Sequence, residues 1–141
     1  MYEWFVALSV LAVIAVIAFI VSKSPQDQRG QYPKLAQISA NYAAIDPVYG
    51  NIPLREGSSA YTENKSVITI CLKDPQTGHE YDMNTLMYVA LHELAHATTR
   101  EEGHGEAFKA RFQELLKKGY QLGFYDPNIP MPPAYCGVRA S

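Results

Sequence analysis

The residues of this chain that are best suited to chemistry lie between positions 92 and 104 of its 141 residues. His92, Glu93 and His96 form an H-E-x-x-H pattern, and His104 follows inside the block Gly-His-Gly-Glu-Ala-Phe. Histidines four residues apart on a helix project from the same side and can give one zinc ion two nitrogen ligands. A carboxylate beside them can take a proton from zinc-bound water. The pattern therefore predicts hydrolysis that depends on Zn²⁺, with Glu93 as the general base.

A third protein ligand has to come from outside the H-E-x-x-H pattern, because a catalytic zinc site uses three protein ligands and leaves the fourth position to water. We expect His104 to be this ligand. The polar turn before it can bring its ring back over His92 and His96, and the glycines on either side allow close approach. Acidic residues nearby are the alternative ligands: Glu101, Glu102 and Glu106. H-E-x-x-H also occurs in helices that bind no metal.

The elements that must position these residues follow from the spacing of apolar side chains. Residues 34–45 have apolar residues three and four apart, which predicts an amphipathic helix. Residues 66–72, SVITICL, are rich in β-branched side chains and predict a strand that pairs with the segment around residues 60–62.

The H-E-x-x-H pattern itself falls in a predicted helix over residues 85–99, capped by Asp82 or Asn84. A further amphipathic helix is predicted over residues 106–118. The expected fold class is α+β. It is a compact domain made of a helix, a small antiparallel sheet, the H-E-x-x-H helix and a following helix.

The start of the chain differs in character from the rest. Residues 4–21 carry no charged side chain, and a helix of this stretch would be about 27 Å long, close to the ~30 Å core of a bilayer. A cleaved signal peptide would need a basic segment before the apolar run and small residues after it, and the flanks have neither. Lys23, Arg29 and Lys34 follow the stretch. We therefore predict an uncleaved, single-pass transmembrane helix. Because positive charge favours the cytoplasmic side of a membrane, the C-terminal domain is expected in the cytoplasm or interior.

The predicted organisation has four parts: an N-terminal transmembrane anchor (1–22), a tether (23–34), a zinc metalloprotease domain (35–123) and a proline-rich tail (124–141). Cys71 and Cys136 lie far apart and have no C-x-x-C spacing, so they predict neither a zinc knuckle nor a dense disulfide framework. We interpret Cys71 as a buried strand residue. A further hypothesis is that the tail folds back and that Cys136 occupies the open zinc position as an inhibitory thiolate.

Three segments together resemble the small zinc metalloproteases of the WLM and SprT-like families, which are minigluzincin-like H-E-x-x-H zincins. They are the strand ITICLKD, the helix with HELAHAT and the block GHGEAF, within residues 67–118. The resemblance implies a zincin-like α+β domain with His92, His96 and His104 as zinc ligands and Glu93 as general base. It also implies that the strand with Ile68 borders the cleft, where a substrate peptide could add as an extra strand.

The function expected from the sequence is that of a membrane-anchored zinc endopeptidase acting on protein or peptide substrates. The formal net charge of -2 shows no basic surplus, so nucleic-acid binding is not indicated. The alternative is a membrane-tethered structural or assembly protein, of a virus particle for example, in which a fourth protein ligand makes the zinc a clamp. Three tyrosines are candidates to stabilise an oxyanion: Tyr120, Tyr125 and Tyr135.

Overall fold

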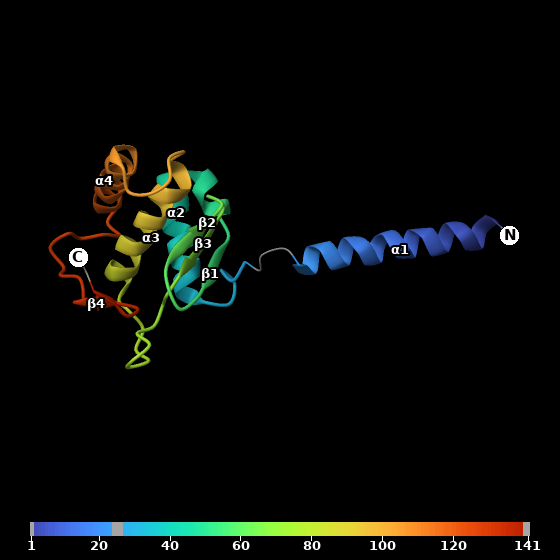
Figure 1. Cartoon of the computed structure of the whole chain (residues 1–141), viewed down its shortest axis with the longest axis horizontal. Helices are drawn as coiled ribbons and strands as arrows, with labels where there is room; N and C mark the ends of the chain where they lie inside the picture. Colours follow the sequence, from blue (N-terminus) through green and yellow to red (C-terminus); the bar gives the residue numbers. More distant parts are fainter. Residues whose placement is uncertain (1, 24–26, 140–141) are drawn as a thin grey trace.

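The computed structural model describes residues 2–23 and 27–139, and the elements occur in the order shown in Figure 1. The helices are α1 (Tyr2–Lys23), α2 (Pro33–Ile45), the 3-10 helix η1 (Pro47–Asn51), α3 (Met83–Thr98) and α4 (Glu106–Gln121). The strands are β1 (Leu54–Glu56), β2 (Tyr61–Glu63), β3 (Val67–Ile70), β4 (Ala134–Tyr135) and β5 (Val138–Arg139). The predicted helices at 34–45, 85–99 and 106–118 are confirmed as α2, α3 and α4, and the predicted strand pair is β2 and β3.

The main sheet has the strand order β1-β3-β2. β2 pairs with β3 in antiparallel orientation, but β1 pairs with β3 in parallel orientation, with Leu54 opposite Ile68. The chain crosses the end of β3 at Gly57, where a Cβ atom would lie 2.6 Å from Cγ2 of Thr69. The sheet is therefore mixed, and the prediction of an antiparallel sheet is wrong. β1 has three residues, too few to show its direction in the sequence pattern.

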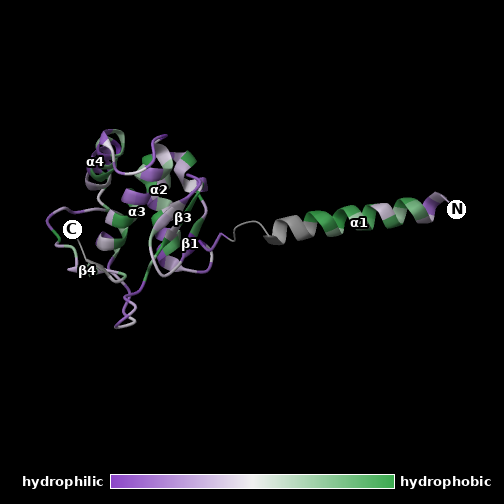
Figure 2. Cartoon of the chain, viewed as in Figure 1, coloured by the Kyte–Doolittle hydropathy of each residue, from purple (hydrophilic) through white to green (hydrophobic). Residues whose placement is uncertain are grey.

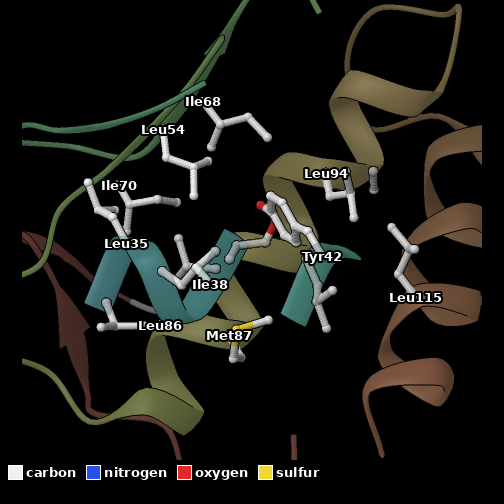
Figure 3. Packing of buried hydrophobic residues seen from close by; sticks show 14 of the residues in the cluster. Leu35, Ile38, Tyr42, Leu54, Ile68, Ile70, Leu86, Met87, Leu94 and Leu115 are labelled. Carbon is white, nitrogen blue, oxygen red and sulfur yellow. The ribbon is translucent and has the colours of Figure 1, made fainter. Parts of the chain in front are cut away.

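The hydrophobic core lies between this sheet and the three helices α2, α3 and α4 (Figure 3). Leu54, Ile68 and Ile70 face the core from the sheet. Tyr42 of α2 is fully buried in the middle of the cluster, and its hydroxyl donates a hydrogen bond to the backbone carbonyl of Ala90 in α3. α3 is thus held by contacts with α2, the sheet and α4.

The N-terminal helix α1 does not fulfil the membrane prediction. Its described side chains, at residues 2–17, are exposed and mostly apolar (Figure 2), and no other element of the described chain packs against it. Among the described residues, no helix has the length and apolar character needed to cross a membrane. The predicted transmembrane anchor and the predicted single-pass membrane localisation are therefore wrong.

The segment predicted as a tether contacts the domain. Residues 24–26 lie outside the described residues, but the backbone N–H of Gln28 donates to the carbonyl of Leu54 at 2.8 Å. The Gln28 side-chain oxygen accepts from the backbone N–H of Glu56, also at 2.8 Å. Residues that follow α1 therefore cover the outer edge of β1.

The C-terminal tail is also tied to the domain, although residues 140–141 lie outside the described part. β4 and β5 form a hairpin, and Cys136 in its turn is disulfide-bonded to Cys71, at the end of β3. The hydroxyl of Tyr135 donates to the backbone carbonyl of Cys71 at 2.6 Å and accepts from its N–H at 3.0 Å. Because the sulfur of Cys136 is bonded to Cys71, the hypothesis of an inhibitory Cys136 thiolate on the zinc is wrong.

The disulfide gives a stability prediction. The two cysteines are 65 residues apart, so reducing the bond should lower the free energy of unfolding by about 2–4 kcal/mol, mainly by freeing the unfolded chain. Denaturant unfolding of the oxidised and reduced protein measures the difference. Cys136→Ser should match the reduced protein and should not respond to reductant. Equal stability of the oxidised and reduced protein would contradict the prediction.

Candidate metal site

Three histidine rings meet at the carboxyl end of α3. His92 and His96 lie one helical turn apart on α3, and the loop between α3 and α4 brings His104 over them. Nε2 of His104 lies 3.1 Å from Nε2 of His96 and 3.3 Å from Nε2 of His92. The structure thus brings together the three residues that the sequence singled out as ligands. That they bind zinc stays a prediction.

The geometry of the three rings fits a tetrahedral metal ion. Zinc–nitrogen bonds of ~2.0–2.1 Å at tetrahedral angles place two ligand nitrogens ~3.3–3.4 Å apart, close to the two distances from His104. Hydrogen bonds alone explain these contacts less well. A neutral ring nitrogen carries either one hydrogen or one lone pair, so Nε2 of His104 cannot make good hydrogen bonds to His92 and His96 together. A cation between the rings accommodates both contacts.

Phe108, in the first turn of α4, supports all three rings from one side. Its ring stacks on His96 with centroids 4.3 Å apart, and its edge contacts with His92 and His104 have centroids 4.9 Å apart. The spacing of apolar residues predicts Phe108 as a core residue, and it is buried. Its contact with the histidines was not predicted. The signal available in the sequence was its position four residues after His104.

Burial keeps the histidines of α3 in their neutral form. It lowers the pKa of His92 to about 4, and the neighbouring His96 and His104 rings contribute in the same direction. The pKa of His96 is also lowered, first by burial and then by His104 and Lys65, while Glu102 acts in the opposite direction. A neutral imidazole is the form that donates its lone pair to a metal, so both side chains are prepared as ligands at neutral pH.

Glu93 is buried, with 6% of its surface exposed, and points to the sheet side of the site. Burial raises the pKa of its carboxyl group, while a hydrogen bond from Thr62 acts in the opposite direction. Oγ1 of Thr62, in β2, lies 2.7 Å from Oε2 of Glu93 and 3.1 Å from its backbone oxygen. A carboxylate held in this way, with a raised pKa, is suited to accept a proton. Thr62 was not among the predicted site residues.

A pocket of about 480 Å³ opens in front of the three rings. Its walls come from β2 with the following turn, from α3 and from the α3–α4 loop: Ala60, Tyr61, Thr62, Asn64, Lys65, His92, Glu93, His96, Glu102, Gly103 and His104. The predicted tyrosines lie elsewhere. Tyr120 and Tyr125 line a second pocket, and Tyr135 contacts Cys71. Tyr61 is the tyrosine on the wall of the first pocket. Because Tyr61 belongs to β2, one strand of the sheet forms part of this wall.

The acidic alternatives to His104 do not join the ligand group. In the described part of the chain, the group of side chains that could hold one ion consists of the three histidines. Glu102 extends into solvent, with 92% of its side chain exposed, and Glu106 pairs with Lys109 on the surface of α4. The geometry therefore favours His104 over these carboxylates as the third ligand.

No family model and no solved structure matches this chain. The chain is similar to an uncharacterised protein of Invertebrate iridescent virus 3, with 40% identity over 91 residues, 64% of this chain and 57% of that protein. A similar protein of Invertebrate iridescent virus 6 is 41% identical over 91 residues, 63% of this chain and 51% of that protein. One of Acanthamoeba polyphaga mimivirus is 38% identical over 93 residues, 64% and 47% of the two chains. The chain spans about half the length of these curated relatives.

The contact between Thr62 and Glu93 gives a prediction that does not depend on metal. Thr62→Val keeps the shape of the side chain but removes the hydroxyl that satisfies the buried Glu93 carboxyl group. The free energy of unfolding of the metal-free protein should fall by about 1–3 kcal/mol in denaturant titrations at neutral pH. Thr62→Ser retains the hydroxyl and is the matched control. A Thr62→Val variant as stable as Thr62→Ser would contradict this role.

Proposed function

We propose that this chain is a zinc-dependent endopeptidase. The observation that carries the proposal is the convergence of His92, His96 and His104 on a pocket whose wall also holds the buried carboxyl group of Glu93. Three nitrogen ligands beside an open space are the donor set of a catalytic zinc site, in which the fourth position receives water or substrate. A carboxyl group on the same wall supplies the base.

The roles of the residues follow from their surroundings. A zinc ion supplies a Lewis acid that polarises a carbonyl group and lowers the pKa of water to about 7. Glu93 accepts the proton from the attacking water and passes it to the leaving amide nitrogen, since its raised pKa suits both steps. Thr62 holds the Glu93 carboxyl group in place through a hydrogen bond. Phe108 packs against all three histidine rings on one side.

The two edges of the sheet differ, and this difference favours a peptide as the proposed substrate. The edge of β1 is occupied by residues 27–28, which bond to the backbone of Leu54 and Glu56. β2 forms the other edge of the sheet, and its residues Tyr61 and Thr62 line the pocket. An extended peptide can add to such an edge through main-chain hydrogen bonds. The strand expected to border the cleft, with Ile68, is instead the central strand, so β2 takes that role.

The alternative function, a structural protein with zinc as a clamp, would require a fourth protein ligand. In the described residues the ligand group has three members, and the space beside them is the pocket. A buried carboxyl group with a raised pKa has no task in a closed structural site. The endopeptidase is therefore the function that these contacts favour.

Replacing the base tests the proposal. Glu93→Gln should bind one equivalent of zinc as the unmodified protein does, because glutamate is not a ligand in this arrangement. Its rate of hydrolysis of an unfolded protein such as casein should fall by ~100-fold or more, since general-base catalysis contributes about 10²–10⁴. Zinc content is measured by metal analysis of the purified protein and hydrolysis by release of peptides.

Glu106→Gln is the matched control, because Glu106 is an exposed carboxyl group outside the pocket. It should retain both zinc and activity. Hydrolysis by Glu93→Gln at the unmodified rate would show that Glu93 is not the base. If the unmodified protein bound zinc and cleaved no unfolded protein, the endopeptidase proposal would be wrong and a structural clamp would be favoured.

A further inference from the structure

The loop that carries His104 has few contacts with the rest of the domain. Residues 100–104, between α3 and α4, are all exposed, and Gly103 adopts a left-handed conformation with φ of 81°. Among the hydrogen bonds of the described residues, the backbone carbonyl of Glu101 receives one, from the side chain of Lys65. Such a loop loses conformational entropy when it brings His104 to the other two rings, unless another contact already holds it there.

Lys65 is placed to be that contact. It lies in the turn between β2 and β3, where Asn64 and Lys65 both have positive φ angles, as in the tight turns that join such strands. Its Nζ donates to the carbonyl of His96 at 2.8 Å and to the carbonyl of Glu101 at 3.2 Å. The carbonyl of His96 lies in the last turn of α3, where carbonyl groups have no hydrogen-bond partner within the helix. One ammonium group thus joins the end of α3 to the loop.

We infer that Lys65 is a positioning residue that holds the His104 loop against α3 and so increases the affinity of the site for zinc. This inference rests on the proposed zinc site. The three hydrogens of an ammonium group can serve two carbonyls together, and a shorter or apolar side chain cannot. With the loop held in advance, zinc binds to three rings that already converge. Without this contact, part of the free energy of zinc binding is used to order the loop that carries His104.

Because Lys65 is charged, its removal could change zinc affinity in either direction, by two different effects. A positive side chain beside the rings repels a divalent cation. By charge alone, removal of Lys65 would therefore tighten zinc binding. By loss of positioning, removal would weaken it. The sign of the change distinguishes the two effects.

Lys65→Met tests the inference, because methionine retains an apolar stem and removes the charge and the donors. We expect the dissociation constant for zinc, measured by competition with a chromophoric chelator, to rise ~10–100-fold, the usual effect of losing a residue that orients a ligand. The same substitution in a His104→Ala background should have no such effect, since there is then no third ring to position. Lys65→Arg should remain close to the unmodified protein, because guanidinium can also donate to two carbonyls.

Lys117→Met, on the exposed face of α4, is the matched control and should leave zinc affinity unchanged. Thermal unfolding of each metal-free variant verifies the fold, and Lys65→Gln replaces Lys65→Met if the latter does not fold. Unchanged or tighter zinc binding by Lys65→Met, with weaker binding by His104→Ala, would overturn this inference and leave the proposed function intact. An unmodified protein that binds no zinc would overturn both.

Discussion

The site depends on the way α3 is buried. The helix must cover its apolar side completely while the stripe that carries His92 and His96 stays open to the pocket. Leu86 and Leu94 are fully inaccessible in the core (Figure 3), and the hydroxyl of Tyr42 fixes the helix at a backbone carbonyl. A rotation of α3 about its axis would expose leucine side chains and break this bond, at a loss of about 1.5–3 kcal/mol for each large apolar side chain. The direction of the histidine rings is therefore set by the core.

Much of this arrangement follows from local sequence patterns. The 3.6-residue period predicts α2, α3 and α4, and the β-branched run predicts β3, because each pattern reports which side of an element is buried. The H-E-x-x-H spacing predicts that His92 and His96 face the same way. The glycine-flanked His104 needed one further assumption, that its loop turns back, and the distances between the rings bear it out.

The residues that sequence reasoning missed act over long separations in the chain. Thr62 and Lys65 contact α3 residues 31 positions further along, and nothing in a local pattern reports such a contact. Tyr135 meets Cys71 across 64 positions, so a proline-rich tail that resembles extended chain is held on the domain. At the other end, the apolar composition of residues 4–21 predicted a membrane span that the described part of α1 does not provide.

The bond between Cys71 and Cys136 closes residues 71–136 into a covalent ring that contains α3, the His104 loop and α4. Cleavage of one peptide bond within this ring releases no fragment, because the disulfide still joins the two parts of the chain. If one copy of this protein cut another in the exposed loop at residues 100–104, the two ends would remain joined through the sulfur atoms. Self-cleavage at this loop would then leave the mass of the molecule nearly unchanged under non-reducing conditions, and the fragments would separate once the disulfide is reduced.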